Sequence, residues 1–152
     1  MLLIIGIFVG LLGLAVLATV IYILVNRRKN LRVLVGSPGK VEVGSKFKLD
    51  LRITNPTRAT ETLEFLDVNK SFLDCFEMIG VLPHAQSKVE ALGSTGIHYQ
   101  KEIGPGQFIS IEIHLRAVRP GKARGEISAI NSRLLAGKGA RTMVEVIPSD
   151  SS

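Results

Sequence analysis

The chain lacks tryptophan, has a single cysteine, and contains only 5% aromatic residues among its 152 residues. One thiol, Cys75, cannot form an internal disulfide. The sequence therefore excludes a disulfide-stabilised scaffold and a zinc site built from several cysteines. Apolar residues make up 46% and charged residues 21% of the chain, which is typical of a globular protein rather than a disordered one. This length predicts one modest domain with at most a short additional segment.

The first segment has no charged side chain from Leu2 to Val25. A helix over this run would be about 36 Å long, which is enough to cross a hydrocarbon core of about 30 Å. We therefore predict a transmembrane helix over residues 1–26, with Tyr22 at the level of the membrane interface. A cleavable signal peptide is the alternative. Such peptides carry a basic segment before a shorter apolar core, and neither feature is present here.

Four basic residues follow this run within a juxtamembrane segment, residues 27–32: Arg27, Arg28, Lys29 and Arg32. By the positive-inside rule, they predict that the protein is a single-pass protein of the cell membrane with its C-terminal domain in the cytoplasm. The same side chains would attract anionic membrane lipid. An export route could override this charge bias, so an extracytoplasmic domain remains the alternative.

Small residues are spaced along one face of the predicted membrane helix. Gly6 and Gly10 form a GxxxG pattern, and Gly13 follows about one turn later. Such residues allow two helices to approach closely, so we predict a helix-packing face here. The alternative is that glycine is simply common in membrane spans.

Apolar and polar residues alternate through much of the remaining chain. Residues 46–54 have apolar side chains at 47, 49, 51 and 53, and residues 108–116 repeat the pattern at 109, 111, 113 and 115. Weaker strand patterns cover Leu31–Val35, Val41–Val43, Glu61–Leu66, Phe76–Val81, Ile97–Lys101, Gly125–Ile130 and Thr142–Ile147. Glycine and proline turns separate them, and no helical period is sustained. This pattern predicts an all-β, immunoglobulin-like antiparallel β-sandwich over residues 33–148 and a disordered tail over 149–152.

Two strands resemble sequence patterns of bacterial immunoglobulin-like modules. Residues 44–55 match G-x-x-F-x-L-x-L-x-I-x-N, and residues 106–115 match G-Q-x-x-x-I-x-I-x-L. Over residues 31–148 the chain is similar to cell-adhesion-related modules and to the immunoglobulin-like segment of membrane proteins that carry a von Willebrand A domain. The resemblance implies a hairpin from Arg116 to Gly125 and a closing strand that ends near Pro148. It implies a fold and no functional residue, and no metal-dependent adhesion site, because the chain ends before any von Willebrand A domain.

The histidines form no ligand motif. His84, His98 and His114 are far apart in sequence, and none has a second candidate ligand two or four residues away. His98 and His114 would approach each other only if their strands pair, and a zinc site needs three or four ligands. We therefore expect surface histidines and no metal.

Other motifs are also weak. Residues 39–46 imitate a phosphate-binding loop, but a strand follows instead of the helix that such a loop requires. A group of acidic residues would need a cleft to act in catalysis, and strand alternation predicts that they lie on solvated faces or loops: Glu61, Glu64, Asp67, Asp74 and Glu77. We expect no catalytic residue, no cofactor and no enzyme activity.

A basic cluster gathers in the C-terminal third: Arg116, Arg119, Lys122 and Arg124, followed by Arg133, Lys138 and Arg141. It is a possible interaction face for anionic lipid, RNA or an acidic protein. No aromatic residues are interleaved with it, which argues against nucleic acid as a partner. A solvated basic face is the simpler interpretation.

Two functional hypotheses remain. In the first, the chain is a membrane-anchored interaction or scaffold module, an accessory or structural subunit of a larger membrane complex. Its partners would be membrane lipid and other membrane-protein subunits, contacted through the helix and the sandwich. In the second, it is an extracytoplasmic adhesion or ligand-binding module anchored by its N-terminus, which depends on fold analogy alone.

Overall fold

The computed structural model describes residues 1–28, 30–132 and 139–150. One long helix, α1 (Leu2–Arg28), is followed by ten strands and a one-turn helix, α2 (Lys70–Leu73). The strands are β1 (Arg32–Gly36), β2 (Lys40–Glu42), β3 (Lys46–Thr54), β4 (Glu61–Asn69), β5 (Phe76–Leu82), β6 (Ser87–Ala91), β7 (Ser94–Ile103), β8 (Phe108–Ala117), β9 (Gly121–Asn131) and β10 (Ala140–Ile147).

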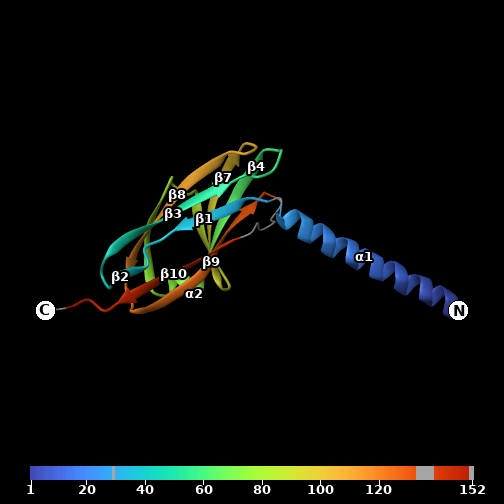
Figure 1. Ribbon diagram of the computed structural model, residues 1–152, viewed down its shortest axis with the longest axis horizontal. Coiled ribbons are helices and arrows are strands. Elements are labelled where there is room, and N and C mark those ends of the chain that lie inside the picture. The colour runs from blue at the N-terminus through green and yellow to red at the C-terminus, as the bar shows by residue number, and fades with distance from the viewer. Residues whose placement is uncertain (29, 133–138, 151–152) are drawn as a thin grey trace.

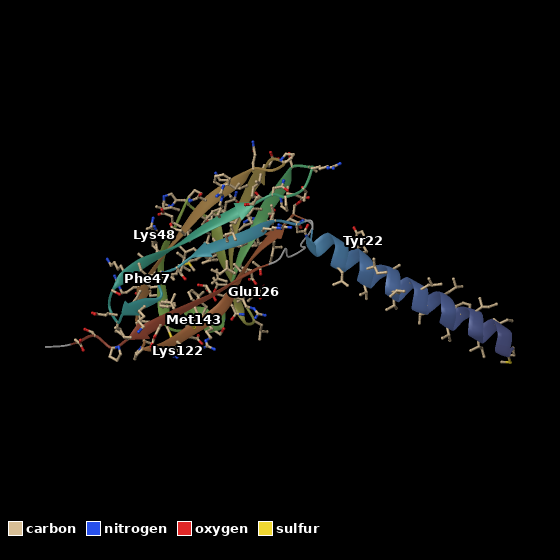
Figure 2. All side chains as sticks on the ribbon, in the orientation of Figure 1. Tyr22, Phe47, Lys48, Lys122, Glu126 and Met143 are labelled. Atoms are coloured by element: carbon tan, nitrogen blue, oxygen red, sulfur yellow. The ribbon has the colours of Figure 1, made fainter. Side chains whose placement is uncertain are left out.

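The N-terminal helix extends away from the rest of the chain (Figure 1). Its segment Ile4–Tyr22 has a mean hydropathy of 2.8 and buries none of its surface against the protein. Apolar side chains point outward around the helix, and Tyr22 lies near the end that meets the β domain (Figure 2). A helix that is apolar on all sides and unburied fits a lipid environment. It is long and apolar enough to cross a membrane, although an N-terminal signal sequence has the same properties.

The strands form two sheets packed face to face. The four-stranded sheet has the order β1-β3-β8-β5, and the six-stranded sheet has the order β2-β10-β9-β4-β7-β6. Neighbouring strands are antiparallel except for β2, which runs parallel to β10. The chain changes sheet between β1 and β2, in the short connection that contains Pro38. The expected all-β sandwich behind an N-terminal apolar helix is confirmed.

The core follows the predicted alternation. On β3, Leu49, Leu51 and Ile53 are almost completely buried. Leu49 and Leu51 lie opposite Ile113 and Ile111 of β8, which are also fully buried. The polar residues between them face solvent, because successive side chains of a strand point to opposite sides of the sheet. The two strands with the clearest alternation therefore pair in the centre of the four-stranded sheet.

The expected hairpin between Arg116 and Gly125 is wrong. Strand β8 lies in the four-stranded sheet and β9 in the six-stranded sheet, so the connection through Pro120 crosses from one sheet to the other. The physical reason is that β3 and β5 already occupy both edges of β8. A proline-glycine pair indicates a break between two strands, but it does not determine which strands pair.

The chain enters the sandwich almost directly after α1. Asn30 and Leu31 are 2% and 1% exposed, and β1 begins at Arg32. The Asn131 side-chain amide donates to Asn30 Oδ1 at 3.3 Å and lies 3.5 Å from Glu61 Oε2. Glu61 is thus buried, at 9% exposure, and the expectation of a solvated carboxylate is wrong at this position. The strand pattern did not predict this burial, because the polar partner of Glu61 comes from a residue that is distant in sequence.

Candidate functional site

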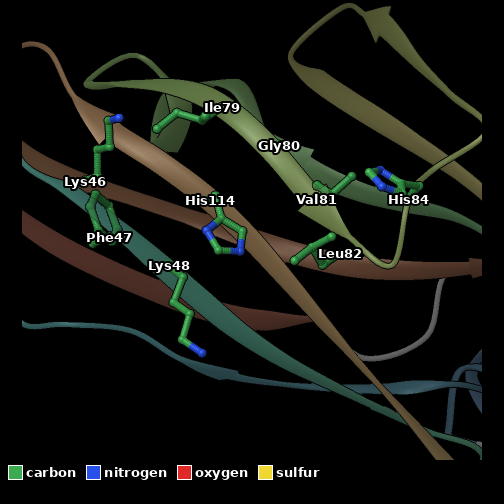
Figure 3. A pocket seen from close by; sticks show the side chains of 9 residues that line it. All are labelled: Lys46, Phe47, Lys48, Ile79, Gly80, Val81, Leu82, His84 and His114. Atoms are coloured by element: carbon green, nitrogen blue, oxygen red, sulfur yellow. The ribbon is translucent and has the colours of Figure 1, made fainter.

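A groove lies on the four-stranded sheet beside its edge strand β5. Its volume is about 590 Å³, and it is lined by Lys46, Phe47, Lys48, Ile79, Gly80, Val81, Leu82, His84 and His114. The lining comes from β3, β8, β5 and the segment after β5. In Figure 3, His114 lies between Lys48 on one side and Leu82 on the other.

A bulge in β5 shapes the apolar wall of this groove. Met78 pairs with Leu115 and Gly80 with His114, so Ile79 is an extra residue without an opposite partner on β8. Bulges redirect side chains locally. Ile79 is accordingly 47% exposed, and Leu82 at the strand end is similarly exposed. The result is a line of aliphatic side chains along the rim of the sheet.

The edge of β5 is chemically different from the edge of β6. Strand β5 is the last strand on its side of the four-stranded sheet, and β6 is the last on one side of the six-stranded sheet. Exposed β6 carries Lys88 and Glu90, and such charges discourage pairing with a further strand. The end of β5 instead presents Ile79, Val81 and Leu82. Of these two edges, β5 is the one that favours the addition of an extended segment.

A shared carboxylate organises the polar side of the groove. Glu112 Oε1 accepts a hydrogen bond from Lys48 Nζ at 2.8 Å, and Glu112 Oε2 lies 3.1 Å from His114 Nε2. Lys48 also contacts Asp50 at 3.3 Å. The hydrogen bonds from Lys48 and then His114 lower the pKa of Glu112, and the bonds to Glu112 and then Asp50 raise the pKa of Lys48. These exposed groups therefore stay charged at neutral pH and hold His114 at the groove.

A buried tyrosine holds the segment that follows β5. The Tyr99 hydroxyl donates to the Pro83 carbonyl oxygen at 3.1 Å. Burial raises the pKa of Tyr99 to about 12, because the phenolate would lose its hydration. The neutral tyrosine of β7 thus ties the six-stranded sheet to the residue before His84, which lines the groove.

The structure separates the three histidines. His84 and His114 line the groove, whereas His98 lies on β7 in the other sheet. His98 Nε2 is 2.9 Å from Glu64 Oε1, and its ring stacks on Phe65 with centroids 4.9 Å apart. Strands β7 and β8 do not pair, so His98 and His114 do not meet. Within residues 1–28, 30–132 and 139–150, no group of three or more His, Cys, Asp or Glu side chains is placed to hold a metal ion.

The predicted basic face is divided between the sheets. Arg116 lies on β8, where it forms an ion pair with Glu77 at 3.2 Å. Arg119 lies in the crossover, and Lys122 and Arg124 point outward from β9. Arg124 and Arg141 line a second hollow of about 450 Å³ on the six-stranded sheet. Arg133 and Lys138 lie outside the described residues, and an interaction role for this face stays a prediction.

The residues predicted on and after the membrane helix are placed as follows. Gly6, Gly10 and Gly13 lie on α1 with no atom within 4 Å of the position that a Cβ would occupy. Arg27 and Arg28 form the end of α1, and Arg32 is the exposed first residue of β1. Lys29 lies outside the described residues. Helix packing and membrane orientation by these residues stay predictions.

Sequence reasoning missed the groove. It predicted β5 as a weak strand, and it did not predict β6. The available signal was the segment Phe76–Leu82, which is mostly apolar and does not alternate cleanly. Such a pattern in a half-exposed strand indicates an edge with apolar side chains on both faces.

Comparison with solved structures identifies the fold as an immunoglobulin-like β-sandwich. A cohesin module from a Clostridium perfringens family 33 glycoside hydrolase superposes with a TM-score of 0.54 at 14% identity, over 80% of this chain and 99% of that chain. A Salmonella alpha-2-macroglobulin mutant gives 0.54 at 15% identity, over 78% of this chain and 7% of that chain. AvmM, which catalyses macrocyclization in alchivemycin A biosynthesis, gives 0.52 at 11% identity, over 82% and 93%.

No protein-family model and no curated protein matches the chain. At these identities the structural likeness establishes the fold alone. The resemblance to bacterial immunoglobulin-like modules is therefore confirmed for the fold, and no particular family is shown. Proteins with this fold include an enzyme, AvmM, so the expected lack of catalytic activity stays a prediction.

Proposed function

We propose that the protein is a single-pass, membrane-anchored interaction module that acts as an accessory subunit of a larger membrane complex. The observation that carries this proposal is the apolar, unpaired edge of β5 beside the groove. The apolar helix α1 supplies the anchor, and the glycines along it supply a surface for packing against other membrane helices.

The chemistry of the groove defines the partner segment. An extended chain that pairs with β5 would gain backbone hydrogen bonds along the strand and place alternate side chains over the groove. Ile79 and Leu82 favour an apolar side chain at one position. Lys46 and His84 at the groove favour an acidic group nearby. Lys48 and His114 already contact the Glu112 carboxylate. The proposed occupant is therefore an extended apolar and acidic segment of a partner protein.

A matched pair of edge substitutions tests this binding mode. Ile79 on β5 is 47% exposed and Val89 on β6 is 48% exposed, so replacing either by lysine changes size and charge similarly. We expect Ile79→Lys to abolish co-purification of a stoichiometric partner from membranes extracted in mild detergent, because an edge lysine opposes strand addition. Val89→Lys should leave the partner bound.

Cross-linking supplies the second measurement. A photo-reactive side chain at position 82 should cross-link to that partner, and one at position 89 should not. Equal cross-linking at both positions, or a protein that remains a lone monomer in several mild detergents, would contradict the proposal.

A further inference from the structure

We propose that the end of the sandwich nearest α1 is a docking surface for anionic lipid headgroups. This inference rests on the proposed function, because it requires α1 to lie in a bilayer. The covalent connection sets the geometry. Only the segment from Arg28 to Arg32 separates the helix from the first strand, and a chain of this length reaches at most about 14 Å. One end of the sandwich must therefore lie close to the membrane surface.

Strand register identifies that end. Arg32 pairs with Thr54, and Thr54 pairs with Phe108, so the start of β1, the end of β3 and the start of β8 lie together. Glu61 pairs with Ile103, which adds the start of β4 and the end of β7. The connections 55–60 and 104–107 are consequently found where α1 joins the sandwich, and the C-terminus lies at the opposite end (Figure 1). We call this set of segments the proximal end.

The exposed charge of the proximal end is mainly positive. Its exposed basic side chains are Arg32, Arg52, Arg58 and Lys101. Glu102 is an exposed carboxylate at the same end, and Glu61 is buried. The proximal end thus continues the basic segment at the end of α1 onto the folded domain. A surface of this sign is complementary to anionic lipid.

An aromatic side chain lies within this basic surface. Phe108 is 49% exposed, and the Arg52 guanidinium carbon lies 3.6 Å from the centre of its ring. The Arg52 charge is therefore held over an exposed apolar ring. An aromatic body with a charged group above it suits the boundary between headgroups and hydrocarbon.

Hydrogen bonds make the two proximal connections one rigid surface. The buried Asn55 side chain donates to the carbonyl oxygens of Ala59 at 2.7 Å and Ile103 at 2.8 Å. The Asn55 backbone N–H donates to the Gln107 carbonyl oxygen at 2.9 Å, and Gly106 N–H donates to the Asn55 carbonyl oxygen at 2.9 Å. Arg58 is thus presented on a loop that is already ordered, which reduces the entropy lost on binding.

Docking at this end would also orient the groove. Strand β5 pairs with β8 along one side of the sandwich, with Phe76 opposite Ala117 at the distal end. The groove therefore lies on the flank of the domain and not on the proximal end. A domain docked through its proximal end would hold the β5 edge open toward neighbouring membrane proteins.

The test uses the full chain in lipid nanodiscs and compares phosphatidylcholine alone with a mixture containing one third phosphatidylserine. We expect amide hydrogen exchange of residues 57–60 to be about three- to tenfold slower in the anionic discs at low salt, because the loop contacts headgroups. High salt should remove this difference. Exchange in the distal segment 118–121 should be the same in both lipids.

Two charge-reversal variants provide the matched comparison. Arg58→Glu with Lys101→Glu changes the proximal end, and Arg119→Glu with Lys122→Glu makes the same change in charge at the distal end. All four side chains are exposed. The proximal variant should lose the protection and the distal variant should keep it, with equal thermal midpoints showing that both are folded.

The two proposals fail in different ways. If the chain stays in the discs after alkaline washing but exchanges equally in both lipids, lipid docking is overturned and the anchor stands. Equal loss of protection in both variants would also overturn docking, as would protection by soluble polyglutamate in phosphatidylcholine discs, which would indicate an acidic protein partner. If the chain does not remain in the discs, the anchored module and the docking surface are both overturned.

Discussion

Asn55, Tyr99 and Asn131 are polar side chains that the sandwich buries almost completely. Each has hydrogen-bonding partners, as the cost of burying an unpaired polar group requires. Asn55 lies in a turn that the sequence marks clearly, and Tyr99 lies in a predicted strand. The partners were not predictable, because Ile103 and Pro83 are distant in sequence from the residues that they contact.

Tyr99 should make stability sensitive to alkaline pH. Its folded-state pKa is about 12, whereas an unfolded tyrosine ionises near 10. Between pH 10 and 12 the unfolded chain loses this proton and the folded chain keeps it, so stability falls as the pH rises. The full loss is about 3 kcal/mol.

Chemical denaturation of the detergent-solubilised protein measures this effect. Tyr99→Phe should cost about 1 kcal/mol at pH 7 through the lost hydrogen bond to Pro83, and it should remove the tyrosine-dependent part of the decline above pH 10. The other tyrosine gives the control, since Tyr22→Phe on α1 keeps Tyr99 and should keep the Tyr99-dependent decline. Identical pH profiles for wild type and Tyr99→Phe would contradict the assignment.

At the scale of helices and strands, the alternation of apolar residues predicts some elements and misses others. The alternating strands β3 and β8 were predicted with nearly correct bounds, because a half-buried strand has a period that the sequence displays. Strand β6 was missed, since all of its residues are exposed and it shows no apolar face. The short helix α2 was missed because one turn is too brief to display a helical period.

The packing of α2 on β9 requires glycine at position 125. A Cβ at Gly125 would lie 2.6 Å from Phe72 Cβ and 3.1 Å from Asn69 Cβ. Phe72 is the buried residue of α2, and Asn69 is the N-cap of that helix. We expect Gly125→Ala to destabilise the protein by about 1 to 3 kcal/mol, because the helix must move away from the sheet.

A second strand glycine provides the comparison in the same denaturation experiment. No atom lies within 4 Å of the Cβ position of Gly80 on β5. Gly80→Ala should therefore change stability by no more than about 0.5 kcal/mol. Equal stability of the two alanine variants would show that α2 does not pack closely on β9.

At the scale of the whole molecule, the proposed anchor raises the question of the side of the membrane on which the sandwich would lie. The basic residues after α1 predict the cytoplasm, with the extracytoplasmic side as the alternative. The lone thiol would be a natural probe, but Cys75 is buried against the sandwich and is poorly suited to labelling.

A cysteine at the tip of the β6–β7 hairpin answers this question. Leu92 is fully exposed, so Leu92→Cys adds an accessible thiol and leaves Cys75 as the internal control. We expect a membrane-impermeant maleimide to label Leu92→Cys only after cell lysis. Labelling in intact cells would place the domain outside and favour the adhesion hypothesis.

The sequence by itself determined the apolar helix, the two-sheet class and most strands. These features depend on the local period of apolar residues, which each segment carries in its own order of side chains. It also determined that the histidines form no local metal motif.

Only the tertiary structure decided which strands pair, that β8 and β9 lie in different sheets, and that β5 forms an open edge beside a groove. The tertiary structure also decided that hydrogen bonds of Asn55 join the connections of the proximal end. The reason is that strand pairing and edge exposure depend on contacts between segments far apart in the chain. Many arrangements of the same strands bury similar apolar faces, and local sequence does not distinguish among them.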